Sequence, residues 1–500
     1  MSEVLLGERP LTVADIAALA GGEARIGLAP PACAAIDSGH AALLRFMESG
    51  GAVYGVTTGL GAAVDTRLSL ARPLPQERIP LARSVGVGAY ASPAQVRAIM
   101  AARLARLAQG RSGISLSTAE ALASLLNAGI LPLVPLTGSV GEADLAPLAH
   151  IAAVVFGAGE AEVDGSTMPG AAALARFGLT PPEAGPKDGL ALVSSNAASV
   201  GLGALVVHKA RRVLAGLLAA ACLSLEGFRA NLSPVSAAAV PLHPVPGFDR
   251  LARCLGEVFA DSTLIRPGAA RRLQDPLSFR CLGPVHAAAL SALDNAQGII
   301  QIELNSSDDN PAILAEQSLA LPTASFDATH LALAFEGLGL ALSRAAALAG
   351  ERVMQLMSPV ASDLPRFLAP PLEGRSGFSA LQKTVSALVA EIQFRASPMP
   401  VVILPVADRI EDYGTMATAI VLKAEAILDR LRILSAIELI VAAQACDVRA
   451  GTLLRGRMAA LHGMVRGIVR HLEDDRPAAP DIAHLVAALE DTEVIEPFTL

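Results

Sequence analysis

Long segments rich in alanine and leucine most constrain the fold of this chain. Five of them follow residue 190, and each is separated from the next by loops that contain proline and glycine. They cover residues 202–227, 285–303, 328–357, 379–396 and 415–445. Alanine and leucine have high helix propensities, and segments of these lengths suit the long helices of a bundle. The sequence therefore predicts an all-α fold with a central bundle of long helices.

The first part of the chain has a different texture, because shorter candidate helices alternate there with glycine-rich loops. Ser92 is the candidate N-cap of one helix, and Ser117 with Glu120 has the spacing of a capping box for the next. We therefore expect a smaller, mixed N-terminal domain over residues 1–189 and the helix bundle with C-terminal helices over residues 190–500.

Composition limits the classes of function. The chain has 500 residues, of which 52% are hydrophobic and only 17% are charged, and its net charge is −8. Because the sequence contains no long basic run, binding to a nucleic acid backbone is not expected. The five cysteines are scattered without a CxxC pair, which suggests neither a disulfide framework nor a thiolate metal site and fits a cytoplasmic location.

No part of the sequence predicts a membrane protein. The N-terminal segment MSEVLLGERPLTVADIAAL lacks the charged, apolar and cleavage regions of a signal peptide. The apolar run at residues 213–225 is too short to cross a bilayer, so we expect it to be part of a buried helix. Since few charges are available to cover a monomer, such helices are also expected to pack against other subunits.

Common catalytic motifs are missing from the sequence. It contains no GxSxG, Walker phosphate loop or HExxH helix, and its Gly-x-Gly pairs lack the third glycine of a dinucleotide fingerprint. The nine histidines lack close ligand spacing, so no metal is expected.

A series of short motifs in a fixed order resembles one family. The motifs are YGVTTGLG (54–61), GSVGEADLAPLAH (138–150), KDGLAL (187–192), QDPLSFRC (274–281), DNP (309–311), RSGF (375–378), AEIQ (390–393) and IEDY (410–413). Together they are similar to motifs of the aromatic amino acid ammonia-lyases and aminomutases, whose best-known members act on histidine, phenylalanine and tyrosine. The resemblance implies an ammonia-lyase-like (fumarase/aspartase-like) fold and a homotetramer whose active sites are shared between subunits.

The main departure from the family pattern concerns its electrophile. In the family, Ala-Ser-Gly follows GSVG and cyclises to a methylidene-imidazolone. Here Gly141 is followed directly by Glu142, so the loop is one residue shorter and has no serine to dehydrate at that place. Ser139 belongs to GSVG and precedes Val140, so it cannot simply substitute. We therefore expect no methylidene-imidazolone and no other cofactor.

Several pocket positions of the family have changed as well. The family's pocket asparagine falls on Ser194, with Asn196 close by. Its Phe-His pair becomes Phe326-Asp327, and its substrate-selecting histidine becomes Arg83. The resemblance therefore implies a remodelled pocket.

Other family residues are retained. Tyr54 matches the base that removes a proton β to the amine, which requires a setting that favours the phenolate; a packed hydroxyl is the alternative. Arg280 matches the arginine that binds the substrate carboxylate, with a buried salt bridge to Asp309 as the alternative. Glu391 and Glu411 match acidic pocket residues, and either can instead hold helices together.

Two further residues decide what the remodelled pocket can do. Glu142 is a candidate general acid for a leaving group or an anion that recognises an ammonium, and equally a loop carboxylate that caps a helix. Arg83, beside Arg280, would bind a second carboxylate or another anionic group; otherwise it forms an ion pair. Asp144 matches an aspartate that the family already has, so we expect it to be structural.

These residues favour an enzyme that eliminates or adds a group next to the carboxylate of a small carboxylic or amino acid by acid–base chemistry alone. Tyr54 would abstract the proton, Arg280 would hold the carboxylate, and Glu142 would assist the leaving group. Isomerisation needs the same groups. Two alternatives remain: a conventional aromatic amino acid ammonia-lyase of the histidine type, and a non-catalytic ligand-binding or partner subunit.

Overall fold

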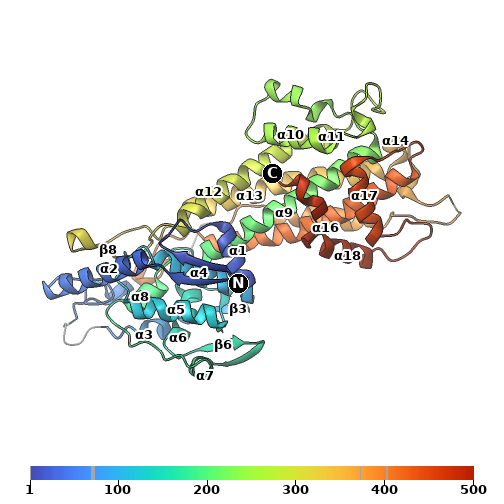
Figure 1. The fold of residues 1–500 in the computed structure, drawn as a ribbon. Coiled ribbons are helices and arrows are strands. Elements are labelled where there is room, and N and C mark those ends of the chain that lie inside the picture. Colours follow the sequence, from blue (N-terminus) through green and yellow to red (C-terminus); the bar gives the residue numbers. More distant parts are fainter. Residues whose placement is uncertain (1, 69–73, 372, 401–403, 492) are drawn as a thin grey trace. The chain divides into compact units, whose positions relative to one another are not determined.

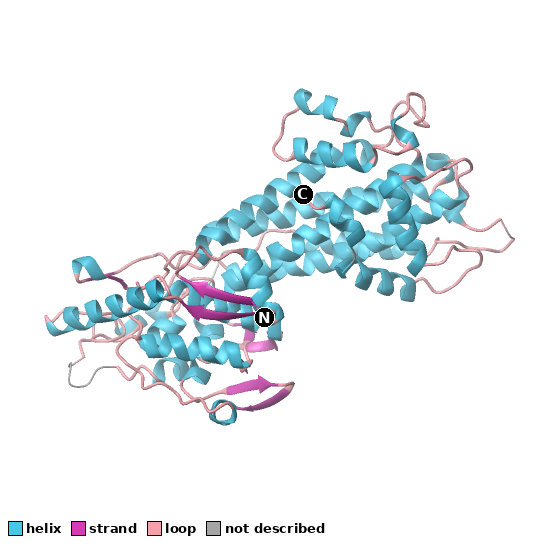
Figure 2. Cartoon of the chain, in the orientation of Figure 1, coloured by secondary structure: helices cyan, strands magenta, loops and turns pink. Residues whose placement is uncertain are grey.

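A computed structural model describes residues 2–68, 74–371, 373–400, 404–491 and 493–500. Helices dominate this part of the chain, and the strands are short (Figure 1 and Figure 2). The predicted all-α fold is therefore confirmed.

The chain packs into two compact units. The first contains Met1–His208, Ala296–Ala334 and Met399–Leu422, and the second contains Lys209–Asn295, Phe335–Pro398 and Lys423–Leu500. The first unit thus takes in later segments of the chain in addition to residues 1–189. These later segments matter for function because they bring residues near 327 and 411 into the same unit as Tyr54 and Glu142.

Short helices and small strand pairs build the first unit. Its helices include α1 (Val13–Gly21), α2 (Pro30–Glu48), α3 (Arg78–Arg83), α4 (Pro93–Leu107), α5 (Leu116–Ala128), α6 (Leu145–Val155), α7 (Gly170–Arg176) and α8 (Asp188–Val193). Its strands include β1 (Ser2–Leu6), β2 (Ala24–Leu28), β3 (Val87–Tyr90), β4 (Leu131–Pro132), β5 (Pro135–Thr137), β6 (Glu160–Val163), β7 (Ser166–Pro169), β8 (Ala312–Leu314) and β9 (Leu319–Leu321). β1 and β2 are parallel, whereas β3 with β5, β4 with β6, β6 with β7 and β8 with β9 are antiparallel.

The five predicted long helices are all present and agree with the sequence within a few residues. They are α9 (Ala197–Phe228), α12 (Leu282–Leu304), α13 (Thr329–Leu356), α15 (Leu381–Arg395) and α16 (Ala417–Val448). The shorter helices are α10 (Phe248–Val258), α11 (Leu277–Arg280), α14 (Pro359–Ser362), α17 (Gly456–Ile468) and α18 (Ala479–Asp491). Both α9 and α16 carry long rows of fully buried alanine and leucine, so apolar packing accounts for the bundle.

The predicted helix starts are right in one case and wrong in the other. Ser92 is the N-cap of α4, as predicted, and it also forms a capping box with Gln95. Ser117 does not cap α5, because the N-cap is Ser115, whose side chain accepts a hydrogen bond from the Thr118 amide. The Asp188 carboxylate also accepts hydrogen bonds from the Ser115 amide and hydroxyl, both at 2.7 Å, and so fixes the earlier start.

The apolar run at residues 213–225 was expected to be too short to cross a membrane, but it is part of a longer helical stretch, so length does not exclude a membrane span. Two helical stretches, Asp188–Phe228 and Thr329–Leu356, are long and apolar enough by composition, and the first contains this run. However, 94% of its most apolar window is buried inside the protein, compared with 61% for Thr329–Leu356. The first stretch therefore behaves as a core helix, as expected, whereas the second leaves apolar side chains exposed.

A buried group of charges joins α4 to the segment that follows α12. Arg103 donates to Asp308 at 3.1 Å and to Asp309 at 2.9 Å, and all three side chains are about 1% exposed. Arg106 also pairs with Asp308. Lys187 lies 3.9 Å from Asp309. Within the first unit, Asp309 is therefore paired with Arg103 and lies close to Lys187.

Candidate active site

The loop between β5 and α6 is anchored by the fully buried carboxylate of Asp144. Its Oδ1 accepts hydrogen bonds from the hydroxyls of Ser139 at 2.7 Å and Thr418 at 2.8 Å. Its Oδ2 accepts from the amide and hydroxyl of Ser199 at 2.7 and 2.8 Å. Ser199 and Thr418 lie in the first turns of α9 and α16, so Asp144 fastens the loop to the beginnings of two helices. These contacts agree with a structural role for Asp144.

Gly141 fits the loop closely against the start of α16. Its carbonyl accepts a hydrogen bond from Thr415 Oγ1 at 2.7 Å, and the Met416 amide donates to the Val140 carbonyl at 2.8 Å. Gly141 has a φ of +82°, and a Cβ added there would lie 2.3 Å from Thr415 Oγ1. Only glycine therefore suits this position.

Glu142 follows as a half-buried residue whose carboxyl group lies near other acids. The pKa of Glu142 is raised to about 8, first by burial and then by the charge of Asp327, a hydrogen bond with Asp327 and the charge of Asp144, in that order. Its Oε1 is buried and has no hydrogen-bond partner among the described residues. Glu142 is therefore protonated near neutral pH and can donate a proton to a ligand.

Asp327 connects Glu142 to the start of α13. The backbones of Glu142 and Asp327 form an antiparallel bridge. Asp327 Oδ1 and Oδ2 accept hydrogen bonds from the amide and hydroxyl of Thr329, each at 3.0 Å. Thr329 Oγ1 lies 2.9 Å from Tyr413 Oη, and Tyr413 is 47% exposed. The sequence analysis named Asp327 only as a departure from the family pattern and did not select Thr329 or Tyr413 as site residues. The Asp-x-Thr spacing before a helix was the signal that could have linked Asp327 to Thr329.

Tyr54, Arg83 and Glu411 form a second group of candidate side chains in the same unit. Tyr54 Oη accepts a hydrogen bond from the Gly61 amide at 2.9 Å. Burial lowers the pKa of Arg83, while the charges of Tyr54 and Glu411 act in the opposite direction and so lie within electrostatic reach of its guanidinium. No ion pair of Arg83 occurs in the part of the chain that the structure describes, although it donates to the Ile79 carbonyl at 3.5 Å. Arg83 is thus a half-buried cation available to an anionic ligand.

The segment that contains Glu411 and Tyr413 reaches both groups. Glu411 acts on Arg83, and Tyr413 contacts Thr329, which holds Asp327 beside Glu142. Because consecutive Cα atoms are about 3.8 Å apart, two residues of separation span at most roughly 7 Å. Within the first unit, the Tyr54 group and the Glu142 group therefore adjoin the same short segment.

Three other predicted residues of the first unit have different surroundings. Asn196 is fully buried, its side-chain oxygen accepts from Arg106, and its amide donates to Asp308 at 2.7 Å. These contacts belong to the buried charge group, although Asn196 Nδ2 has no partner among the described residues. Ser194 is the half-buried C-cap residue after α8, and Phe326 is half-buried immediately before Asp327.

Arg280 and Glu391 lie in the second unit. Arg280 is the last residue of α11, is half-buried, and forms no ion pair within the described ranges. Glu391 accepts a hydrogen bond from Arg430 at 2.6 Å and pairs with Arg395 at 3.3 Å. Arg430 lowers the pKa of Glu391, which is half exposed. The contacts of Glu391 within this unit join α15 to α16, as the structural alternative predicted.

The residues of the 138–144 loop do not fit the methylidene-imidazolone that the resemblance implies. That group requires a serine, flanked by alanine and glycine, that loses water. The serine of this loop, Ser139, donates to Asp144 and accepts the Gly141 amide hydrogen at 3.0 Å. The residue after Gly141 is Glu142, and Gly141 itself has no room for a side chain. No residue of the loop therefore supplies the required dehydroalanine.

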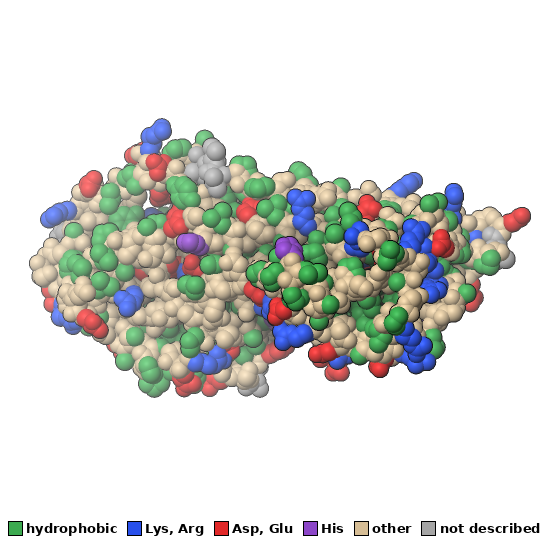
Figure 3. Space-filling view, turned by 90° about the horizontal axis from the view of Figure 1, so that it is seen from above, with side chains coloured by type: hydrophobic (Ala, Val, Ile, Leu, Met, Phe, Trp, Pro, Cys, Tyr) green, Lys and Arg blue, Asp and Glu red, His purple; other side chains and the backbone are tan. Residues whose placement is uncertain are grey.

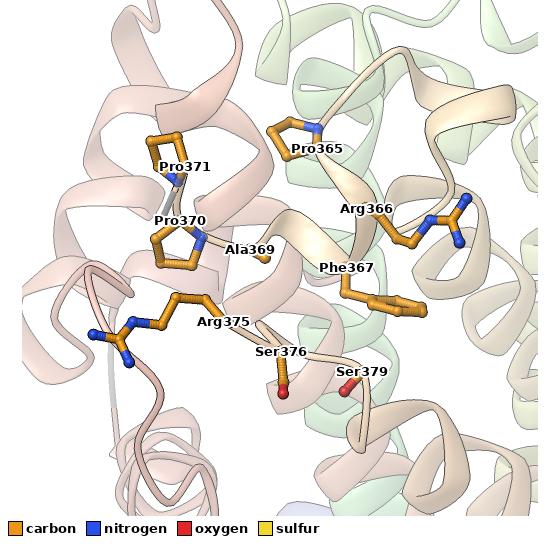
Figure 4. A pocket seen from close by; sticks show the side chains of 9 residues that line it. All are labelled: Pro365, Arg366, Phe367, Ala369, Pro370, Pro371, Arg375, Ser376 and Ser379. Carbon is orange, nitrogen blue, oxygen red and sulfur yellow. The ribbon is translucent and has the colours of Figure 1, made fainter. Parts of the chain in front are cut away.

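A separate cavity of about 420 Å³ lies in the second unit. It is lined by Pro365, Arg366, Phe367, Ala369, Pro370, Pro371, Arg375, Ser376 and Ser379 (Figure 4). Arg375 at its edge pairs with Asp474 at 3.0 Å. The cavity shares no residue with the candidate active site.

Comparisons with known proteins identify the same family that the ordered motifs resemble. The sequence model of the aromatic amino acid lyase family matches residues 11–467. Histidine ammonia-lyase of Gloeobacter violaceus is 38% identical over 493 residues, which cover 97% of this chain and 95% of that protein. Histidine ammonia-lyase of Anaeromyxobacter dehalogenans is 36% identical over 509 residues, which cover 99% of this chain and 100% of that protein.

Solved structures match over the whole chain as well. The ergothioneine-degrading ergothionase of Treponema denticola, in complex with desmethyl-ergothioneine sulfonic acid, has a TM-score of 0.93 and 28% identity and covers 98% of this chain and 99% of its own. Phenylalanine aminomutase of Pantoea agglomerans has a TM-score of 0.93 and 28% identity, with coverages of 99% and 100%. The central helix bundle and the smaller mixed portion are features of this shared fold.

Proposed function

Because the chain belongs to the aromatic amino acid lyase family, we propose that it eliminates a group, or adds one in reverse, next to the carboxylate of a small carboxylic or amino acid. In this proposal acid–base side chains carry the reaction and no methylidene-imidazolone takes part. The observation that carries it is the Glu142 carboxyl, which is protonated near neutral pH and has an unpartnered buried oxygen where the family's electrophile would begin.

The proposed elimination balances with two protein groups. The phenolate of Tyr54 takes a proton from the carbon next to the one that bears the leaving group. The electron pair of that C–H bond forms the C=C bond as the bond to the leaving group breaks. Glu142 gives its proton to a leaving group that departs as a base, such as a neutral amine or hydroxide. The product is an unsaturated acid, and the reverse sequence is addition.

The surroundings of Tyr54 support its role as the base. Its oxygen accepts the Gly61 amide hydrogen at 2.9 Å and lies within electrostatic reach of Arg83. A hydrogen-bond donor and a cation both stabilise negative charge on the oxygen. Without the electrophile, an unactivated benzylic proton is hard to remove, so the proposed substrate has a proton that a neighbouring carbonyl acidifies.

The proposed substrate has more than one anionic or polar end. Arg280 would bind the carboxylate that the family recognises, and the half-buried Arg83 would bind a second anionic group. The neighbours support a broad substrate range, because one degrades ergothioneine and another is an aminomutase. Because one neighbour is an aminomutase, the proposal includes isomerisation by the same acid–base groups.

We also propose a cytoplasmic homotetramer with shared active sites. Its support is the large apolar side chains that the bundle leaves exposed, namely Ile302 (63%), Leu333 (66%), Leu340 (41%) and Phe394 (77%). Burying such side chains between subunits is favourable. On the face of the molecule in Figure 3, acidic, basic and apolar side chains are interspersed. All five cysteines are free, which fits a reducing compartment. Light scattering of the purified protein at several concentrations tests the tetramer.

The two alternatives make different predictions. A conventional histidine-type ammonia-lyase would form the electrophile, which lowers the mass of the peptide that contains Gly141 and Glu142 by two water molecules. We expect the unmodified mass in a proteolytic digest. A non-catalytic subunit would bind ligand or a related chain but would turn nothing over.

The deciding experiment compares metabolite extracts after incubation with the wild-type protein, Tyr54→Phe and the control Tyr90→Phe, by untargeted mass spectrometry. Tyr90 is 58% exposed in β3 and is therefore a matched phenol outside the site. We expect a mass pair that wild type and Tyr90→Phe interconvert and Tyr54→Phe does not. Identical profiles for all three proteins across pH would contradict Tyr54-dependent catalysis and favour the non-catalytic reading.

A further inference from the structure

A continuous row of hydrogen-bonding groups leads from Glu142 to an exposed phenol. Glu142 lies beside Asp327, whose two carboxylate oxygens accept from Thr329 at 3.0 Å each. The Thr329 hydroxyl donates to Asp327 Oδ2, so Tyr413 must be the donor in its 2.9 Å contact with Thr329 Oγ1. The donors thus all point toward the carboxyl pair.

We propose that Asp327, Thr329 and Tyr413 form a proton relay that returns a proton to Glu142 after each turnover. The inference rests on the proposed function, because it assigns to these three residues the recharging of the general acid. Asp327 and Thr329 act through Glu142 and are positioning residues in this scheme. Tyr413 is the entry point because 47% of its surface is exposed.

The relay balances in protons. When Glu142 has given its proton away, two carboxylates lie side by side in a half-buried place, which favours uptake of one proton by the pair. Tyr413 passes its hydroxyl proton to Thr329, Thr329 passes its own to Asp327, and Asp327 passes one to Glu142. Solvent then reprotonates Tyr413, so one proton has entered from water.

The charged groups that act on Glu142 come from two elements. Asp327 belongs to the segment before α13, and Asp144 belongs to the loop of Glu142 itself. The residue that packs on this loop beside Gly141, just before α16, is the neutral Thr415. Asp144 accepts four hydrogen bonds from Ser139, Ser199 and Thr418, which occupy both of its carboxylate oxygens. Asp327 is left as the group that can share a proton with Glu142.

Infrared titration of the full-length protein tests the carboxyl pair without any substrate. The C=O band of protonated Glu142 is identified by its loss in Glu142→Gln and followed with pH. We expect a midpoint near pH 8 in wild type. In Asp327→Asn we expect the midpoint to fall by about one pH unit or more, because a negative neighbour has been removed. An unchanged midpoint in Asp327→Asn overturns the inference.

A pair of Thr329 variants tests the relay itself and leaves Asp327 in place. After a rapid drop in pH, the Glu142 band is expected to return at least tenfold more slowly in Thr329→Val than in wild type. Thr329→Ser restores the hydroxyl and is expected to restore the rate. Equal rates in all three proteins overturn the relay. Because this readout needs no turnover, its failure is distinct from a failure of Tyr54-dependent catalysis, which the metabolite experiment detects.

Discussion

Glu142 and Asp327 meet through both backbone and side chain: their backbones form an antiparallel bridge, and their carboxyl groups share a hydrogen bond. Two acids in this arrangement cannot both ionise easily near neutral pH. The consequence is a neutral carboxylic acid held next to a carboxylate, as a general acid requires.

The pH dependence of stability should change in Glu142→Gln. The pKa of Glu142 is about 8 in the folded protein and 4.5 in an unperturbed chain, so between these values the folded state holds a proton that the unfolded state has lost. Stability contributed by Glu142 is therefore complete below pH 4.5 and falls as the pH rises toward about 8. Glu142→Gln should remove this fall, which thermal unfolding at pH 5 and pH 9 can measure. A difference in melting temperature between variant and wild type that is the same at both pH values would contradict it.

Tyr54→Phe should lower kcat/KM by roughly 10²–10⁴-fold, because the variant lacks the general base. Its fold should be unchanged, since the hydroxyl accepts one hydrogen bond, from the Gly61 amide. Steady-state kinetics on the substrate identified from the mass pair check the prediction. Tyr90→Phe is the control, and a similar loss in that variant would argue against a specific role for Tyr54.

Arg83→Gln should raise KM about tenfold or more for a substrate with two anionic groups, because a charge-assisted hydrogen bond is lost. A substrate analogue that lacks the second anionic group should be bound equally well by wild type and variant. Arg78→Gln, at the exposed start of α3, is the matched control. Equal losses for both substrates would show that Arg83 supports the fold and does not recognise the second group.

Asp308→Asn should destabilise the protein by about 3–5 kcal/mol, because it breaks a buried ion pair and leaves Arg103 and Arg106 short of a partner. The Asp308 and Arg103 side chains are each 1% exposed. The control is Asp249→Asn, whose pair with Arg253 is largely exposed and is worth at most about 0.5 kcal/mol. Urea unfolding midpoints compare the two. A small change in Asp308→Asn would mean that the buried charges are replaceable by neutral hydrogen bonds.

The sequence predicted the helices well because their signals are local. Alanine and leucine periodicity and caps such as Ser92 are encoded within one or two turns. The start of α5 was misplaced because the deciding partner of Ser115 is Asp188, which lies far along the chain. Distant contacts cannot be read from a local pattern.

The same limit applies to the site. The sequence identified Glu142 as the residue in place of the electrophile, and the motif order identified Tyr54. It could not give the orientation of Glu142, which depends on the contact with Asp327 from a segment before α13. The structural surroundings of Asn196 were equally hidden, because Arg106 and Asp308 come from other parts of the chain.

The loop that carries Glu142 is fastened at both ends, by Thr415 and Met416 to Gly141 and Val140, and by Ser199 and Thr418 to Asp144. These attachments leave no room for another residue in the loop. Restoring an Ala-Ser-Gly sequence would require an insertion together with release of one of these attachments. Laboratory evolution by single substitutions is therefore expected to change the substrate range of this protein without producing the family's electrophile.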